Sequence, residues 1–161
     1  MEIEQMDASQ VSASVSLCEV NQGNLHEVLK LDVAPDQRHF VAPNAVSIAE
    51  AYFEPRAWFR AVCADDEPVG FIMLYQDTET AEYFLWRLMI DRRHQGRGYG
   101  RRAVELLIDH VRTLPRATSL GVSAVPGDGS PIPFYTSLGF VPTGDVEDGE
   151  DVLRLDLTAQ G

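Results

Sequence analysis

The segment from Arg87 to Arg102 carries six arginines and one acid, Asp91, in a chain whose formal net charge is −12. An apolar run with strand composition ends there in a turn with glycines at alternate positions, Gly96, Gly98 and Gly100, which leads directly into an amphipathic helix. Glycine lets backbone approach a ligand closely, and a helix start presents unpaired N–H groups and the positive end of the helix dipole. This segment therefore predicts a site for a phosphate or pyrophosphate.

Two common phosphate-binding motifs do not fit this segment. The dinucleotide fingerprint needs a glycine three positions after Gly98, where this chain has Arg101. The P-loop needs Gly-Lys-Ser or Gly-Lys-Thr, and the only lysine in the chain is Lys30. The predicted anion site is therefore neither a dinucleotide-binding turn nor a P-loop.

Length and composition predict one domain. A chain of 161 residues with 45% hydrophobic content is long enough to bury a sizeable core. Its apolar runs are far shorter than the ~20 residues that span a bilayer, and its first residues are acidic, so we expect a cytoplasmic protein that binds no membrane. The acidic charge disfavours nucleic acid and suits a cationic substrate. Cys18 and Cys63 lack metal-ligand spacing and are expected to be free thiols.

Hydrophobic periodicity predicts an α/β domain with a mixed, mostly antiparallel central sheet. Residues 1–14 are polar and are expected to form a flexible tail before a domain over residues 15–161. We expect strands at 15–20, 57–64, 69–75, 82–90, 119–125, 140–143 and 152–157, and helices at about 24–31, 47–53, 98–114 and 132–138. The central strands form an antiparallel meander, and the long helix completes a right-handed parallel crossover. The acidic residues 145–151 are interpreted as a turn.

One motif in the arginine-rich segment resembles the acetyl-coenzyme A signature of the GNAT superfamily of N-acetyltransferases. It consists of Leu88-x-Ile90 followed by Gln95-x-x-Gly98-x-Gly100. The resemblance implies a single GNAT-type domain with helices on both sides of the sheet. It also implies that the strand before the glycine turn splays away from its neighbour.

A second motif, Phe-Tyr-x-x-Leu-Gly-Phe at residues 134–140, stands downstream of the crossover helix, where that superfamily keeps it. More narrowly, the chain resembles the bacterial spermine/spermidine (diamine) acetyltransferases. This narrower likeness is carried by residues 33–37, 40–44, 49–53, 83–91 and 125–131. Because part of it lies in the loop expected on the substrate side, it bears on the substrate as well as on the fold.

The resemblance implies acetyl-coenzyme A as cosubstrate. Backbone groups of Leu88 and Ile90 would bind its pantetheine arm as an added strand, and N–H groups from Gly96 to Arg101 would hold its pyrophosphate. Relatives often have an asparagine before the motif tyrosine; here that position is Asp128, and Ser130 would take over its contact. The implied cofactor-binding residues are Leu88, Met89, Ile90, Gln95, Gly96, Arg97, Gly98, Tyr99, Gly100, Arg101, Asp128 and Ser130.

Acetyl transfer to an amine needs a proton donor and a proton acceptor. An ammonium with a pKa of about 10.4 costs about 4 to 5 kcal/mol to neutralise at pH 7. Tyr135 occupies the superfamily's usual general-acid position and would protonate the departing thiolate. Some relatives use a glutamate on the strand before the glycine turn, but the matching positions are Phe84 and Trp86, so Glu82 on the same face is the remaining candidate base.

The expected function is direct acetyl transfer to a primary amine, such as spermine or spermidine, without a covalent enzyme intermediate. Two alternatives stay open: a GNAT enzyme acting on a protein N-terminus, an aminoglycoside or another metabolite, and a non-catalytic acyl-coenzyme A-binding protein. His39 and His94 lack metal-ligand companions, so no metal site is expected. The sequence leaves assembly as a homodimer undecided.

Overall fold

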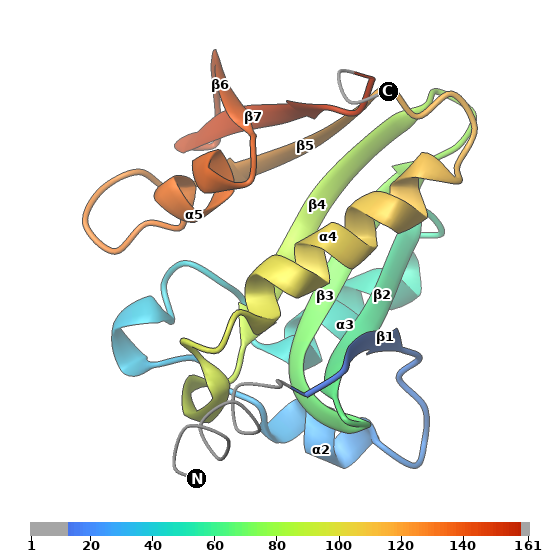
Figure 1. Cartoon of the computed structure of the whole chain (residues 1–161), viewed down its shortest axis with the longest axis vertical. Helices are drawn as coiled ribbons and strands as arrows, with labels where there is room; N and C mark the ends of the chain where they lie inside the picture. Colours follow the sequence, from blue (N-terminus) through green and yellow to red (C-terminus); the bar gives the residue numbers. More distant parts are fainter. Residues whose placement is uncertain (1–12, 159–161) are drawn as a thin grey trace, which may run out of the picture.

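Seven strands form one sheet in the order β1-β2-β3-β4-β5-β7-β6, and the computed structural model describes residues 13–158 (Figure 1). The strands are β1 (Val15–Cys18), β2 (Ala57–Ala64), β3 (Glu67–Asp77), β4 (Glu82–Ile90), β5 (Ser119–Ala124), β6 (Val141–Glu147) and β7 (Glu150–Asp156). The helices are α2 (Leu25–Lys30), α3 (Asn44–Phe53), α4 (Tyr99–Arg112) and α5 (Ile132–Ser137), with single 3-10 turns η1 (Pro35–Gln37) and η2 (Arg92–His94). The predicted single mixed α/β domain is confirmed.

The strand pairing follows the predicted connections. β1 to β4 pair antiparallel in sequence order, and β4 and β5 run parallel on either side of the α4 crossover. Asp65 and Asp66 both have positive φ in the tight turn between β2 and β3, a conformation that hairpin turns require. Residues 1–12 of the expected tail lie outside the described part of the chain.

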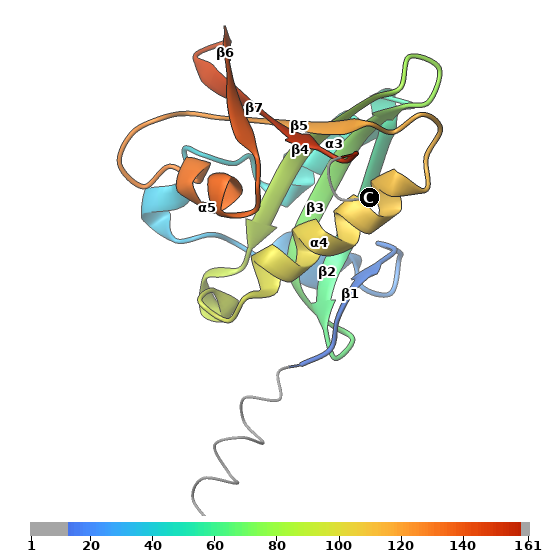
Figure 2. The ribbon, with the colours of Figure 1, turned by 45° about the horizontal axis from the view of Figure 1, so that its top comes forward.

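Helices cover both faces of the sheet. Figures 1 and 2 show α4 on one face, with α2 and α3 on the other. The apolar stripe of α4 is fully buried against the sheet at Val104 and Leu107, while Val28 of α2 and Phe71 of β3 are buried in the opposite cluster. Amphipathic helices on opposite faces thus produce two hydrophobic clusters, one on the α4 side and one on the α2/α3 side.

β4 and β5 diverge soon after they meet. β4 pairs with β3 along its length, but with β5 only at Phe84↔Gly121 and Leu85↔Val122. The two strands approach closely there, since a Cβ on Gly121 would lie 2.8 Å from Phe84 Cδ1. Beyond Leu85, the edge of β4 that faces β5 has no strand partner within residues 13–158. The predicted splay is confirmed.

A β-bulge adds one residue to β4 where the splay begins. Met73 pairs with Arg87 and Leu74 pairs with Leu85, so Trp86 has no partner on β3. Leu85 packs on the α4 side before the bulge, and Leu88 and Ile90 pack on that side after it. The bulge therefore reverses which alternate residues of β4 face α4.

The acidic segment 145–151 differs from the expectation. Most of it is strand, because β6 and β7 extend to a two-residue turn at Asp148 and Gly149, which have φ of 52° and 81°. An Asp-Gly pair suits a type I′ hairpin turn, which fixes the pairing of its strands. As a result, Glu150 is the first residue of β7 and pairs with Glu147.

Candidate active site

A cleft of about 780 Å³ opens where β4 and β5 separate. Its walls are the second half of β4, the end of β5, the segment 94–101, the segment 37–43 and the start of α5. The two outer loops approach each other, since a Cβ on Gly129 would lie 3.6 Å from the ring of Phe40. The cleft thus extends from the amino end of α4, through the gap in the sheet, to the α2/α3 side.

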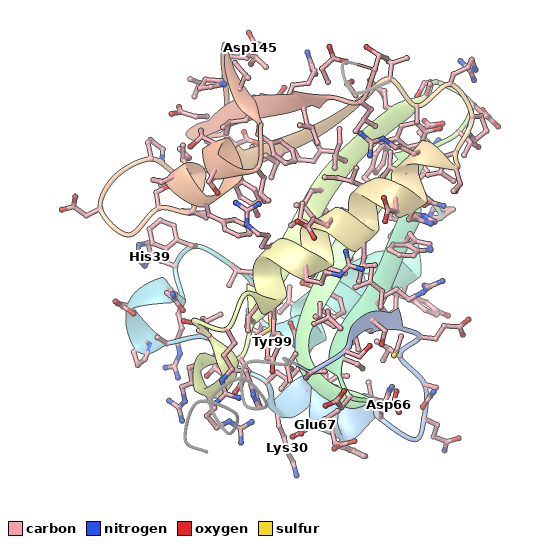
Figure 3. The ribbon with its side chains drawn as sticks, viewed as in Figure 1. Lys30, His39, Asp66, Glu67, Tyr99 and Asp145 are labelled. Atoms are coloured by element: carbon pink, nitrogen blue, oxygen red, sulfur yellow. The ribbon has the colours of Figure 1, made fainter. Side chains whose placement is uncertain are left out.

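One end of the cleft is formed by the glycine turn and the start of α4. Gly96 and Gly98 have φ of 80° and 83°, a left-handed conformation that L side chains rarely adopt, and Gly98 is the N-cap of α4. A glycine N-cap supplies no side chain for the first helical N–H groups, which also lack intrahelical acceptors. Figure 3 shows Tyr99 at this end of α4, and Arg101, two residues further along the helix, lines the cleft. These groups together suit an anionic ligand.

His94 carries a buried polar atom that needs a partner. Its Nδ1 is the buried side-chain polar atom left without a hydrogen bond within residues 13–158. His94 lines the cleft in the same loop as the two glycines. A phosphate-bearing group bound at this end would meet N–H donors, arginine and imidazole together, so the residues present fit such a group.

Asp91 holds the end of β4 in place. It is only 2% exposed, and its carboxylate accepts hydrogen bonds from the Asp32 N–H (2.9 Å), the Arg93 N–H (3.1 Å) and Arg93 Nε (2.8 Å). Burial opposes ionisation, but these hydrogen bonds prevail and lower the pKa of Asp91. Asp91 therefore joins the segment after α2 to the start of the glycine turn.

The side chain of Gln95 is engaged with the protein. Its Nε2 donates to the Ile90 carbonyl at 2.9 Å and to Gln37 Oε1 at 2.9 Å. Gln37 Oε1 also accepts the Ala34 N–H at 3.1 Å. The predicted cofactor contact Gln95 thus lines the cleft and connects the glycine turn to the loop before α3.

Tyr135 lies on the α4 side of the gap. It is 6% exposed and packs edge-on against Phe134 and Phe140, yet it lines the cleft. Burial raises the pKa of its phenol, so the group stays protonated at neutral pH. A neutral phenol at the cleft wall is a proton donor.

Most of the remaining predicted residues also line the cleft, and four do not. The cleft includes Leu88, Met89, Ile90, Gly96, Gly98, Tyr99, Gly100 and Arg101. Arg97 and Asp128 are exposed outside it, and Ser130 accepts the Ile132 N–H at 3.2 Å at the start of α5. Glu82 is exposed at the first position of β4, where its Oε1 accepts from Thr80 Oγ1 at 3.3 Å. Its position does not support the expected role as base.

The cleft also holds a carboxylate that the sequence interpretation missed. Ser123 Oγ on β5 donates to Glu150 Oε1 on β7 at 2.6 Å, and both residues line the cleft. The sequence places Glu150 in the acidic turn expected at residues 145–151, and not in a strand. The Asp-Gly pair at 148–149 was the available signal, since a two-residue turn there places the next residue in a strand.

The α2/α3 side of the cleft carries Trp86 and Arg87, two consecutive residues that the bulge leaves on the same face. Arg87 Nη1 donates to Glu50 Oε1 at 2.7 Å and to Ser47 Oγ at 3.3 Å on α3. The Arg87 guanidinium lies 5.6 Å from the centre of the Trp86 ring. Arg87 and Glu50 therefore neutralise each other at the wall of the cleft.

This architecture defines a class of protein. A strand edge left open beside a parallel neighbour can bind an extended amide-bearing arm, and the helix end in line with it can bind that arm's phosphates. A buried phenol at the gap stays protonated and can act as a proton donor. These are the requirements of a coenzyme A-dependent acyltransferase.

Sequence comparison gives the family. The model of the Acetyltransferase (GNAT) family matches residues 25–140, and the chain belongs to this family of N-acetyltransferases. A curated relative, the spermine/spermidine N(1)-acetyltransferase of Bacillus subtilis, is 26% identical over 155 residues, covering 89% of this chain and 99% of the relative. The predicted superfamily is thereby confirmed.

Solved structures share the fold. An acetyltransferase of Bacillus subtilis in complex with CoA has a TM-score of 0.65 at 17% identity, covering 89% of this chain and 98% of that one. The aminoglycoside acetyltransferase AAC(6')-Ib in complex with coenzyme A has a TM-score of 0.72 at 17% identity, covering 89% and 95%. Across residues 13–158, no helix is long and apolar enough to cross a membrane, and no group of three or more His, Cys, Asp or Glu could hold a metal.

Proposed function

We propose that this enzyme transfers the acetyl group of acetyl-coenzyme A directly to a primary amine of a polyamine or diamine, such as spermine or spermidine. The observation that carries the proposal is the continuous path from the glycine turn, along the open edge of β4, to Tyr135. The likeness to a spermine/spermidine acetyltransferase over nearly its whole length supports the choice of amine.

Residues of this chain would hold acetyl-coenzyme A at both ends. The backbone of Leu88 and Ile90 would hydrogen-bond the pantetheine arm, and the N–H groups from Gly96 to Arg101 would bind the pyrophosphate. The cosubstrate supplies an activated acetyl thioester. The Tyr135 hydroxyl would donate its proton to the thiolate that leaves, which a phenol held neutral by burial can do.

Direct transfer is supported by the position of the two thiols. Cys18 and Cys63 are free, and neither lines the cleft. Burial raises the pKa of the Cys63 thiol to about 12, with a further contribution from the neighbouring Cys18. Neither cysteine is placed to act as a nucleophile for the acetyl group.

The chemistry of the α2/α3 side suits a chain of methylenes that ends in an ammonium. Phe40 and Trp86 offer aromatic surface, which attracts cations as well as apolar chains. Glu150 offers a negative charge in the same cleft. An aminoglycoside would need several polar partners, whereas an aliphatic diamine needs one carboxylate and an apolar wall.

Free thiol release from acetyl-coenzyme A tests the proposal. Spermine, spermidine and shorter diamines should be turned over with higher kcat/KM than an aminoglycoside or a peptide with a free N-terminus. A higher kcat/KM for the peptide or the aminoglycoside would show that the proposed polyamine or diamine substrate is wrong. Calorimetric binding of acetyl-coenzyme A without thiol release on any amine would favour the non-catalytic alternative.

A further inference from the structure

Glu150 is the only carboxylate among the described residues that line the cleft. We propose that Glu150 accepts the proton of the acceptor amine and that Ser123 positions its carboxylate. This inference rests on the proposed acetyl transfer to an amine and assigns the group that makes the nitrogen nucleophilic.

The pairing of β5 and β7 brings the two side chains to one face. Ser123 pairs with Val152, and Glu150 stands two residues before Val152, so alternation places Glu150 on the same face as Ser123. Ser123 Oγ donates to Glu150 Oε1 at 2.6 Å, a short hydrogen bond to an acidic group. Both residues are half-buried in the cleft wall.

That face is opposite to the face that carries Tyr135. Val122 belongs to the cluster on the α4 side together with Tyr135, so its neighbour Ser123 points to the α2/α3 side. The gap between β4 and β5 lies between the two faces. Proton donor and proton acceptor therefore stand on opposite sides of the position where the acyl group would lie.

The other titratable groups of the cleft are less suitable acceptors. His94 lies in the glycine turn at the phosphate end. His39 is exposed and stacks on Phe40 at 3.9 Å, and Figure 3 shows it on the outer loop beside the α5 segment. The pKa of the Tyr135 phenol is raised by burial, which favours its neutral form. Glu150 is the group that combines a carboxylate with a fixed position on the acceptor side.

The reaction balances with these two groups. The acceptor ammonium loses two protons as its C–N bond forms and the C–S bond of the thioester breaks. One proton is lost to Glu150 and then to solvent at the cleft mouth. The thiolate takes the Tyr135 proton, and the second nitrogen proton replaces it on the phenol oxygen. The products are an amide, a free thiol and one released proton.

The test compares Glu150→Gln with wild type across acceptor amines of decreasing basicity. Glutamine keeps the size of the side chain and a partner for Ser123, but it cannot accept a proton. We expect kcat/KM for a strongly basic diamine to fall on the order of 100-fold, with the acetyl-coenzyme A dissociation constant unchanged. The ratio of wild-type to variant kcat/KM should fall toward one for weakly basic amines that are already neutral at pH 7. It should also fall as the pH rises.

Two further variants complete the test. Ser123→Ala should show the same dependence on amine basicity with a smaller loss, because Ser123 acts through Glu150, and Ser123→Thr should restore activity through its hydroxyl. Glu147→Gln, on the paired exposed residue of β6, is the matched control and should leave all rates unchanged.

The outcomes separate the two proposals. A deficit of equal size for every amine, or full activity in Glu150→Gln, overturns the role of Glu150 and leaves acetyl transfer intact. Wild-type protein that releases no thiol with any amine overturns the proposed function and this inference with it. A basicity-dependent deficit confined to Glu150 and Ser123 variants supports the inference.

Discussion

Gln95 donates a hydrogen bond from Nε2 to Gln37 Oε1 at 2.9 Å, although the two residues are 58 positions apart, and Gln37 Nε2 lies 3.4 Å from Gln95 Oε1 in return. The paired amides connect the glycine turn with the segment 37–43, which forms the outer wall of the cleft on the acceptor side. The two halves of the proposed binding site are thus joined by side chains as well as by the sheet.

Gln37→Ala removes this connection. We expect KM for the amine to rise about fivefold, because each net hydrogen bond contributes about 1 kcal/mol to holding the outer loop. Steady-state kinetics with saturating acetyl-coenzyme A measures the change. Asp36→Ala, on the exposed neighbour in η1, is the control and should leave KM as it is. Equal KM values for Gln37→Ala and Asp36→Ala would show that the Gln37–Gln95 pair does not contribute to amine binding.

Tyr135→Phe removes the proposed proton donor and keeps the ring packing against Phe140. We expect kcat to fall about 100-fold, since general acids typically contribute factors of this order, while the dissociation constant for coenzyme A stays within twofold. Tyr83→Phe is the control, because the Tyr83 hydroxyl donates to the Pro115 carbonyl at 2.6 Å in the core, outside the cleft. That variant should lose stability and keep its rate.

The same phenol predicts a feature of the pH profile. Because burial raises the pKa of Tyr135, the hydroxyl keeps its proton through the range where an exposed tyrosine ionises at about pH 10. We therefore expect kcat to show no alkaline decline below about pH 10. A decline centred near pH 8 that is absent from Tyr135→Phe would contradict this assignment.

Gly98→Ala tests the glycine turn through the backbone alone. A Cβ at Gly98 meets no atom within 4 Å, but its φ of 83° costs an alanine about 1 kcal/mol. Relief of that strain turns N–H groups at the start of α4, so we expect acetyl-coenzyme A to bind about tenfold more weakly by calorimetry. Gly144→Ala has the same backbone cost (φ 91°) in β6, outside the cleft, and should lose stability only.

Asp91→Asn replaces the buried carboxylate that ends β4. We expect a loss of about 2 kcal/mol in the free energy of unfolding at pH 7, since charged hydrogen bonds are broken in a buried setting. The pKa of Asp91 is lower in the folded chain than in the unfolded one, so its contribution is present above pH 4 and is lost as pH falls through the folded pKa. Urea unfolding should show the difference between wild type and variant shrinking toward pH 3.

The sequence predicted what depends on local periodicity and local backbone chemistry. The long stripe of α4, the alternation and turns of the central strands, and the glycine turn all have their cause within a few residues, and all were found. The splay of β4 from β5 was expected from resemblance alone. The two strands meet only at Phe84 and Leu85, where Gly121 permits a close approach, and then diverge. This geometry depends on contacts between strands that are distant in the sequence.

Glu82, the base expected from the sequence, lies outside the cleft for a reason of the same kind. A two-residue period extended back along β4 predicts Glu82, but this residue lies beyond the paired Phe84 and Leu85, on the side away from the opening. Glu150 reaches the cleft only because β7 pairs with β5, a contact between strands that the sequence does not encode locally. The short Asp-Gly turn was the single local clue.

The bulge at Trp86 determines which side chains of β4 face α4 and which face the α2/α3 side of the cleft. If β4 lost the bulge but kept its length, strict alternation from Leu85 would place Arg87 and Met89 on the α4 side and Leu88 and Ile90 on the opposite side. The Arg87 guanidinium would be driven into the hydrocarbon beneath α4, and Leu88 and Ile90 would turn toward the polar side. Substitutions that keep the bulge therefore leave the two faces of the wall as they are, whereas loss of the bulge at constant length would exchange them.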